Sequence, residues 1–354
     1  MQSATTTELT ERLPGLEVQQ ATPELKPEHW LERAPGKRLM VFSGRSHPEL
    51  AHRIADQLGV ELGEIALETF ANGETYCRYL ESIRGADVFL VQTGCEPVDQ
   101  NLMELFFMIQ AAHLASAKRI TAVIPWFPYS RQDRKAMPRE PISARLVADM
   151  LQLAGADRVL TMDLHAGQIQ GFFTIPVDHM TSLPLFTRHF RDLGLHGEGV
   201  VSVAPDAGRA KHAVRFAEMI DADFAIMHKT RPAHDIAEVT EVTGRVRGKI
   251  AIIGDDASMT GTTLIQGANA LREHGATDVW VFVTHAVFSS DALATLGEAD
   301  LTGIVVTDTV PVDPTHMPSN MTVLTVAPLL TETIMNVFAD ESVSAIFGGE
   351  NQLF

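Results

Sequence analysis

The sequence has few cysteines and no long hydrophobic segment. Cys77 and Cys95 are its only two cysteines, so the fold cannot depend on a disulfide framework. No uninterrupted apolar run is long enough to cross a bilayer as a helix, and the first residues show no secretory signal pattern. We therefore expect a soluble, cytoplasmic protein with reduced thiols.

Positive charge is also scarce. The 354 residues include 28 lysines and arginines against 45 aspartates and glutamates, which gives a formal net charge of −17. A surface of this sign repels phosphate backbones and anionic lipids, so the composition argues against general nucleic-acid or membrane binding. Local basic clusters can still bind small phosphorylated ligands.

Hydrophobic residues make up 45% of the sequence, which is enough for two domains with buried cores. Residues 1–36 differ from the rest, because prolines at 14, 23, 27 and 35 interrupt any hydrophobic periodicity. We predict that this segment is a flexible tail, with a short docking helix as the alternative.

From Arg38 onward, apolar strand-like runs alternate with helical patterns. "DVFLVQTG", "VVSVAPD" and "KIAIIGD" are nearly continuous apolar runs, which are typical of strands covered on both faces. Between the runs lie helices such as 143–155, where Leu146, Val147, Met150 and Leu151 are predicted to share one face. Ser143 is the predicted cap of this helix, and Gly155 is its predicted end. The fold class predicted is α/β with mainly parallel sheets.

Two segments of the sequence repeat a pattern. "GADRVLTMDLH" (155–165) and "GATDVWVFVTH" (275–285) each begin with Gly-Ala and end with a histidine. Each is predicted to follow a helix and to enter a strand. The repeat indicates two related α/β domains in tandem, and we place the boundary between residues 182 and 183.

The segment "IIGDDASMTGTTL" (252–264) places Asp255 and Asp256 at the end of a predicted strand. Four small residues precede the next helix: Thr260, Gly261, Thr262 and Thr263. Amides at a helix N-terminus and threonine hydroxyls suit a phosphate, and two carboxylates suit sugar hydroxyls or Mg²⁺. A helix cap and a solvated turn would explain the threonines, but not the adjacent aspartates. The segment therefore predicts a sugar-phosphate site.

Other polar residues follow predicted strands, where α/β proteins bind ligands. His165 in "DLHAGQ" has Asp163 two residues before it, and Asp206 follows a strand in "APDAG". A lone histidine is more often structural, and an aspartate after proline is often only a turn or cap. Each is moderate evidence by itself.

Basic residues also follow predicted strands. "RQDRK" (131–135) is the densest basic cluster, and "HKTRP" contains Lys229 and Arg231 before a segment of weak periodicity. A charge run is usually a solvated surface, but positive side chains on a mobile loop can also close over a polyphosphate. "FANGE" (70–74) contains an Asn-Gly signal that predicts a hairpin turn.

From about Arg38 to the C-terminus, the order and spacing of these motifs resemble the ribose-phosphate pyrophosphokinase (phosphoribosyl pyrophosphate synthetase) family. The matching segments are "FANGE", "ESIRGADVFLVQTG", "AVIPWFPYSRQDRK", "DLHAGQIQGFF", "APDAG", "HKTRP" and "GDDASMTGTTL". The resemblance implies two tandem phosphoribosyltransferase-type domains, 37–182 and 183–354, with mostly parallel sheets flanked by helices. It also implies dimer-based oligomers, usually hexamers.

The reaction implied by the resemblance moves the diphosphoryl group of MgATP to the 1-hydroxyl of ribose 5-phosphate and releases AMP. Phe70, Asn72 and Glu74 would contact adenine from a neighbouring subunit, and Arg131 and Gln132 would hold the nucleotide phosphates. His165 and Asp206 would hold Mg²⁺, and Lys229 and Arg231 would close over the transferring group. Asp255 and Asp256 would bind the ribose hydroxyls, and Thr260, Gly261, Thr262 and Thr263 the 5-phosphate.

Some positions depart from the family pattern. Met259 replaces a frequent aspartate in the ribose-phosphate loop, and Arg209 replaces a usual glycine, so that either a side chain intrudes there or a new cation joins the site. Ser82 and Arg84 match family contacts to a phosphate regulator, whereas Ala327 stands where a regulatory serine is often found.

Two alternatives stay open. Met259 and Arg209 favour a catalytically weak regulatory paralogue of the synthetase. A phosphoribosyltransferase would share the fold and the "DD…TG" loop, but would not need "RQDRK" or "FANGE".

Overall fold

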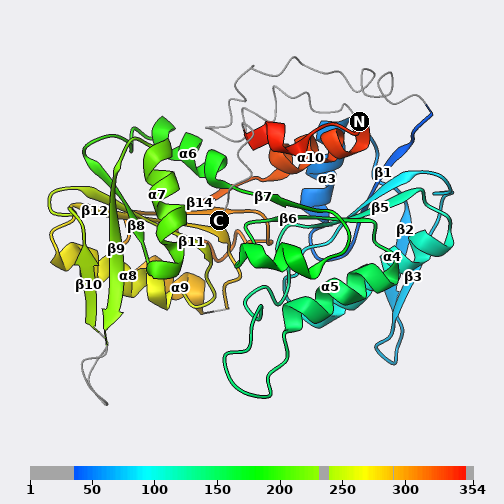
Figure 1. Ribbon diagram of the computed structural model, residues 1–354, viewed down its shortest axis with the longest axis horizontal. Coiled ribbons are helices and arrows are strands. Elements are labelled where there is room, and N and C mark those ends of the chain that lie inside the picture. The colour runs from blue at the N-terminus through cyan, green and yellow to red at the C-terminus, as the bar shows by residue number, and fades with distance from the viewer. Residues whose placement is uncertain (1–35, 231–238, 290, 348–354) are drawn as a thin grey trace. The chain divides into compact units, whose positions relative to one another are not determined.

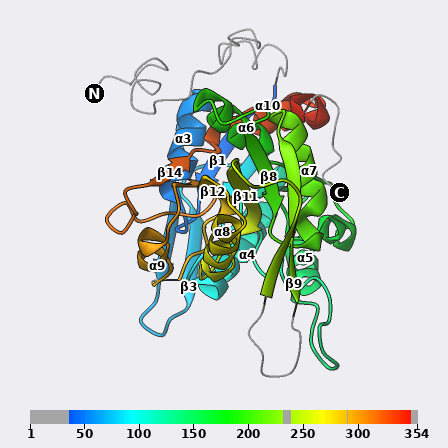
Figure 2. The same ribbon diagram turned by 90° about the vertical axis from the view of Figure 1, so that its left-hand side faces the viewer.

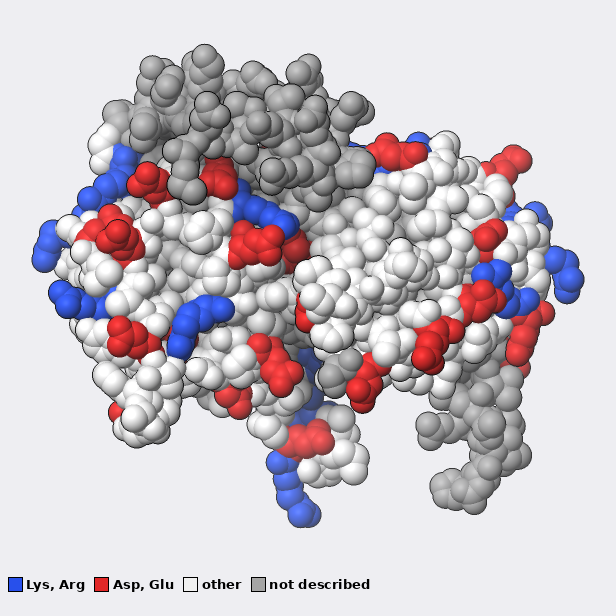
Figure 3. All heavy atoms as spheres, turned by 180° about the vertical axis from the view of Figure 1, so that it is seen from behind, with Lys and Arg blue, Asp and Glu red and all other residues white. Residues whose placement is uncertain are grey.

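The computed structural model describes residues 36–230, 239–289 and 291–347. The predicted N-terminal tail therefore lies outside the described residues, except for Gly36. None of the described helices is long and apolar enough to cross a membrane. On the face shown in Figure 3, lysine and arginine side chains lie interspersed with aspartate and glutamate.

The chain forms two compact units, each of which is discontinuous in sequence. Among the described residues, the first contains 36–161, 168–179 and 327–347, and the second contains 162–167 and 180–326 without 231–238 and 290. This division differs from the continuous segments 37–182 and 183–354, because helix α10 (Ala327–Ala339), near the C-terminus, belongs to the first unit. The predicted domain boundary between residues 182 and 183 therefore stays a prediction.

The first unit contains a five-stranded sheet in the order β1-β4-β5-β6-β7. Figure 1 labels β1, β5, β6 and β7 of this sheet. The bounds are β1 Leu39–Ser43, β4 Asp87–Val91, β5 Arg119–Ile124, β6 Arg158–Met162 and β7 Val177–Met180. The pairs β1/β4, β4/β5 and β5/β6 are parallel. A separate antiparallel hairpin joins β2 (Ile65–Thr69) and β3 (Thr75–Tyr79). Every residue of β4 is buried, as its apolar run predicted.

The helical elements of this unit are α3 Pro48–Leu58, α4 Val98–Leu114, α5 Ser143–Ala154, α10 Ala327–Ala339, and the 3₁₀ segments η1 Gly167–Phe172 and η3 Val343–Phe347. Two details predicted for α5 are wrong. Its N-cap is Ile142 rather than Ser143, and Leu146 is 58% exposed because the buried face runs through Val147 and Leu151. The end at Gly155 is confirmed, since this glycine has the left-handed φ of 109° that favours glycine.

The second unit contains a seven-stranded sheet in the order β10-β9-β8-β11-β12-β13-β14. The bounds are β8 Val200–Ala204, β9 Asp223–Thr230, β10 Val239–Thr243, β11 Ile250–Ala257, β12 Asp278–His285, β13 Gly303–Thr307 and β14 Met321–Leu324. All adjacent pairs are parallel except β9/β10, which is antiparallel. The α/β class with mainly parallel sheets is therefore confirmed.

Helices cover both faces of this sheet (Figure 2). They are α6 Leu183–Asp192, the 3₁₀ turn η2 Ala207–Arg209, α7 Ala210–Met219, α8 Thr262–Glu273 and α9 Ala292–Glu298. On one face Phe186 and Phe216 of α6 and α7 pack against Phe282 of β12. On the other face Leu264 of α8 packs in a cluster with Ile253 of β11. This double covering explains why the strands read as continuous apolar runs.

Candidate active site

The acidic pair lies at the carboxyl edge of the sheet in the second unit. Asp255 and Asp256 are the last polar residues of β11, which is paired in parallel with β8. Asp206 lies just after β8 and begins η2. Because adjacent parallel strands end at the same edge, the topology brings these two strand ends together. These residues therefore follow or end strands, as the sequence predicted, and their assignment to a site stays a prediction.

The loop after β11 leads into the N-terminus of α8. Gly261 is the N-cap residue, with a φ of 71°, and Thr262 and Thr263 form the first turn of the helix. Thr260, Thr262 and Thr263 are exposed, and Oγ1 of Thr260 accepts from the backbone N–H of Thr262 at 3.4 Å. An added Cβ at Gly261 would lie 2.8 Å from Cγ of Leu296, so a larger residue does not fit there. The loop has the chemistry of an anion site.

His165 contacts the acidic pair directly. Its Nδ1 lies 2.7 Å from Oδ2 of Asp256, and the side chain of His165 is 35% exposed. Because the lowered pKa keeps the carboxylate of Asp256 ionised, that oxygen accepts and Nδ1–H of His165 donates. Asp163, which precedes His165 by two residues in the sequence, is not its partner in this contact. Asp163 instead accepts hydrogen bonds from the backbone N–H of Ser182 (2.9 Å) and from Oγ1 of Thr284 (2.8 Å).

Arg209 lies between the same groups. Its Nε pairs with Oδ1 of Asp255 at 3.2 Å, and its Nη2 pairs with Oδ1 of Asp256. The sequence marked Arg209 as a departure from the family pattern, but contained no signal for these ion pairs. Asp206 holds the turn beneath it, because its Oδ1 accepts from the backbone N–H of Arg209 at 3.1 Å.

The pKa values of the two carboxylates are shifted in opposite directions. Burial raises the pKa of Asp255 well above its ordinary value, and the neighbouring charge of Asp256 adds to the rise. Burial alone would also raise the pKa of Asp256, but the hydrogen bond from His165 and the charge of Arg209 outweigh it and lower that pKa. The pair therefore contains one firmly ionised carboxylate, Asp256, and one that protonates more readily.

The predicted adenine-contacting residues lie in the first unit, on the β2–β3 hairpin. The backbone N–H of Phe70 donates to the carbonyl of Glu74 at 2.8 Å, and Gly73 has a φ of 88°. Oδ1 of Asn72 accepts from the backbone N–H of Glu74 at 3.2 Å. The Asn-Gly hairpin turn is therefore confirmed. Phe70 is 49% exposed, and its ring centroid lies 5.6 Å from that of Tyr76.

The basic residues predicted to act on phosphates are only partly described. Arg131 and Gln132 are exposed in the loop between β5 and α5, where Oε1 of Gln132 accepts from Oγ of Ser143 at 2.6 Å. Lys229 lies in β9, with its backbone opposite Thr240 of β10. The side chain of Lys229, and the whole of Arg231, lie outside the described part of the chain.

Comparison with known proteins identifies the family. The family model for the N-terminal domain of ribose phosphate pyrophosphokinase matches residues 39–155, and the phosphoribosyl synthetase-associated domain matches 234–348. A ribose-phosphate pyrophosphokinase of Caldanaerobacter subterraneus subsp. tengcongensis is 47% identical over 309 residues, which cover 87% of this chain and 98% of the relative. The chain belongs to the ribose-phosphate pyrophosphokinase family.

Further relatives agree with this assignment. The ribose-phosphate pyrophosphokinase of Corynebacterium efficiens is 46% identical over 325 residues, 91% of this chain and 99% of the relative. The crystal structure of phosphoribosylpyrophosphate synthetase from Mycobacterium smegmatis superposes with a TM-score of 0.80 at 45% identity. That match covers 86% of this chain and 99% of the solved chain. The phosphoribosyltransferase-type fold expected from the sequence is thereby confirmed.

The residues predicted to bind Mg²⁺ fit that ion when the nucleotide supplies most of its ligands. Among the described residues, no three or more His, Cys, Asp and Glu side chains cluster as a metal site. His165 nevertheless offers Nε2, because Asp256 fixes Nδ1 as the donor. Mg²⁺ commonly takes only one or two protein ligands and completes its shell with phosphate oxygens and water.

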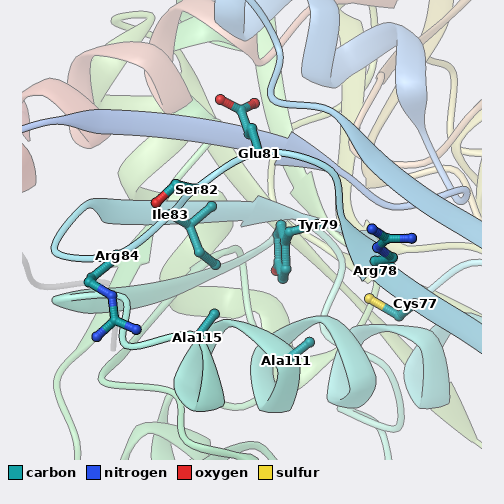
Figure 4. Close-up of a pocket in the computed structure, with 9 residues that line it drawn as sticks. All are labelled: Cys77, Arg78, Tyr79, Glu81, Ser82, Ile83, Arg84, Ala111 and Ala115. Carbon is teal, nitrogen blue, oxygen red and sulfur yellow. The ribbon is translucent and has the colours of Figure 1, made fainter.

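The first unit of this family member also contains a cavity of about 360 Å³ (Figure 4). Its lining comprises Cys77, Arg78, Tyr79, Glu81, Ser82, Ile83, Arg84, Ala111 and Ala115. Ser82 and Arg84, which matched the family's regulator contacts, therefore line the same cavity. Burial raises the pKa of the Cys77 thiol to about 11, so this thiol is neutral at physiological pH.

Proposed function

We propose that the protein transfers the diphosphoryl group of MgATP to the 1-hydroxyl of ribose 5-phosphate, giving 5-phosphoribosyl 1-pyrophosphate and AMP. One observation carries the proposal: a carboxylate pair and a helix N-terminal threonine loop lie in sequence on one sheet edge, with His165 in contact with the pair. The support from relatives is the name they share, ribose-phosphate pyrophosphokinase, at 47% and 46% identity.

The sugar half of the site is assigned to the second unit. Asp255 and Asp256 bind the ribose hydroxyls, and Asp256, the carboxylate whose pKa is lowered, acts as an acceptor only. The 5-phosphate binds at Thr260, Gly261, Thr262 and Thr263, where amides and hydroxyls donate. This assignment uses one end of a single strand and the helix that follows it, so sugar and phosphate are positioned by rigid elements.

The roles at the nucleotide are assigned residue by residue. Phe70, Asn72 and Glu74 contact adenine, and Arg131 and Gln132 contact the phosphates. His165 and Asp206 hold Mg²⁺, which neutralises charge on the phosphate oxygens when it is bound. The oxygen of the sugar 1-hydroxyl forms a bond to the β-phosphorus and releases its proton to water. The bond from that phosphorus to the α,β-bridging oxygen breaks, and AMP leaves with the bridging oxygen and the electron pair of that bond. Lys229 and Arg231 stabilise the charge that develops during transfer.

The proposal extends to the assembly and its setting. We assign a homo-oligomer built from dimers, most simply a hexamer, because the adenine contacts on the β2–β3 hairpin are expected to serve a neighbouring subunit. The exposed position of Phe70 supports a contact of this kind. The cytoplasmic location predicted from the sequence is retained, and the two cysteines are free thiols.

A regulatory paralogue without useful activity is the second candidate. The observation that favours it is the ion pair between Arg209 and Asp256, which occupies a carboxylate needed for ribose. A phosphoribosyltransferase is set aside, since the chain matches synthetase relatives over 87–91% of its length.

A ³¹P NMR time course with ATP, Mg²⁺ and ribose 5-phosphate tests the proposal. Equal release of AMP and of a sugar 1-diphosphate is expected. If the folded protein binds ATP but forms neither product, the protein is a regulatory paralogue and the proposed activity is wrong. If the protein instead catalyses a reaction between phosphoribosyl pyrophosphate and a base without ATP, it is a phosphoribosyltransferase.

A further inference from the structure

The guanidinium of Arg209 is buried among side chains that the proposed function assigns to substrate. Its side chain is only 9% exposed. Besides its two ion pairs with Asp255 and Asp256, its Nη2 lies 3.0 Å from Nδ1 and 3.4 Å from the carbonyl oxygen of His165. A surface arginine would leave most of its donors in water. This one directs them at the acidic pair.

The backbone fixes where this guanidinium can reach. Arg209 ends η2 and is the N-cap residue of α7, and its N–H donates to Oδ1 of Asp206 at 3.1 Å and to the carbonyl of the same residue at 3.3 Å. The turn directly follows β8, and the strand next to β8 in the sheet is β11, which carries the acidic pair. The fold therefore presents the cation to the two carboxylates across one strand spacing.

A charge balance explains why a cation is needed there. Asp255 and Asp256 are adjacent, and their side chains are only 18% and 5% exposed. Two buried carboxylates repel each other and lose hydration, which is costly unless a positive group pairs with them. Without a protein cation, such oxygen ligands would attract a divalent cation from solution. With Arg209 in place, one oxygen of each carboxylate is already paired.

We infer that Arg209 is a resident cation of the carboxylate pair, which takes the place of a free divalent ion there and helps to bind the sugar. Its role toward the sugar rests on the proposed function. A guanidinium has five N–H donors, so it can pair with the carboxylates and still donate to a ribose hydroxyl oxygen. The sugar hydroxyls then meet acceptors on Asp255 and Asp256 and a donor on Arg209.

Binding of Mn²⁺ to the nucleotide-free full-length protein tests the cation role, with free Mn²⁺ measured by electron paramagnetic resonance. Arg209→Gln removes the charge and keeps much of the side-chain volume, and we expect it to bind one more Mn²⁺ per chain than the wild type. Arg209→Lys keeps the charge and should show the wild-type stoichiometry. The extra site should disappear in the double variant Arg209→Gln/Asp255→Asn.

Two outcomes would overturn this role. One is a folded Arg209→Gln protein, checked by circular dichroism, that binds no additional Mn²⁺. The other is a loss of one Mn²⁺ site when Asp255→Asn is introduced into the wild type, because the pair would then already bind metal. This second comparison decides the matter even if Arg209→Gln does not fold.

Calorimetric titration with ribose 5-phosphate separates this inference from the proposed function. In EDTA, the wild type should bind the sugar phosphate, whereas Arg209→Gln should bind it at least tenfold more weakly and recover when Mg²⁺ is added. Equal affinity of both proteins in EDTA would overturn the inference and leave the proposed function intact. Absence of binding to either protein, with or without Mg²⁺, would refute the proposed function instead.

Discussion

His165 and Asp256 are 91 positions apart in the sequence, and their side chains share a hydrogen bond of 2.7 Å between Nδ1 and Oδ2. The carboxylate is buried, whereas the imidazole is 35% exposed. Asp256 thus orients a ring whose other nitrogen is free to bind metal. The same carboxylate also pairs with Arg209, so one side chain connects the proposed sugar and nucleotide halves.

Asp256→Asn should weaken binding of the Mn²⁺–ATP complex by about 10- to 100-fold, the usual cost of removing a carboxylate that orients a metal-binding histidine. Equilibrium binding followed by electron paramagnetic resonance measures this directly. Asp313→Asn is the matched control, because Asp313 is exposed and pairs only with its neighbours Thr315 and His316. Wild-type affinity in Asp256→Asn would mean that His165 needs no such orientation.

Lys229→Ala should reduce kcat by about 10²- to 10³-fold with little change in the KM for ATP, because a charge that acts in the transition state affects turnover more than binding. Steady-state kinetics separate the two parameters. Lys118→Ala, a change at an exposed lysine, serves as the control. A higher KM at unchanged kcat would assign Lys229 to ground-state binding instead.

Met259→Asp should lower the KM for ribose 5-phosphate or raise turnover. Met259 is 51% exposed in the loop that follows the acidic pair, so a carboxylate at this position can remain hydrated. A charged acceptor for a sugar hydroxyl contributes about 1.5–3 kcal/mol, or roughly tenfold or more in affinity. Met259→Leu should behave like the wild type. Loss of activity in Met259→Asp would show that the loop is adapted to methionine.

Phe70→Ala should raise the KM for ATP by roughly tenfold, the usual size of an aromatic stacking contact with a base, without affecting the affinity for ribose 5-phosphate. Because Phe70 is half exposed, the melting temperature should change little. Leu80→Ala removes another exposed apolar side chain, just after β3, and should leave the KM for ATP unchanged. Equal effects of both changes would contradict an adenine contact at Phe70.

The free energy of unfolding should fall as the pH is lowered below about 6.5, the ordinary pKa of histidine. Burial lowers the pKa of His212 and of His285 in the folded chain, so the unfolded chain binds protons first. Stability is then lost by up to about 1.4 kcal/mol per pH unit for each histidine, until the pH reaches the folded pKa.

Urea unfolding between pH 7.5 and 5 measures this slope. His285→Gln should make it shallower by about one proton, whereas His196→Gln, at an exposed position, should leave it unchanged. A slope that His285→Gln does not alter would mean that this ring is protonated in the folded chain.

Local patterns in the sequence were sufficient for the class of fold and for the residues that end its strands. The buried strand β4 and the hairpin turn at Gly73 appear as expected, because an apolar run and an Asn-Gly pair act over a few residues. Leu146 was misplaced, because helical spacing shows which residues share a face but not which face the core covers.

Tertiary structure decided which distant groups meet. His165 contacts Asp256 rather than Asp163, and Arg209 reaches both carboxylates, because β8 and β11 are neighbours in the sheet. It likewise decided that α10 belongs with the first compact unit. The order of strands in a sheet depends on packing over the whole domain, so the strand order cannot be predicted from any short segment of the sequence. By itself the sequence determined the chemistry available at each strand end, and the fold determined which of those groups act together.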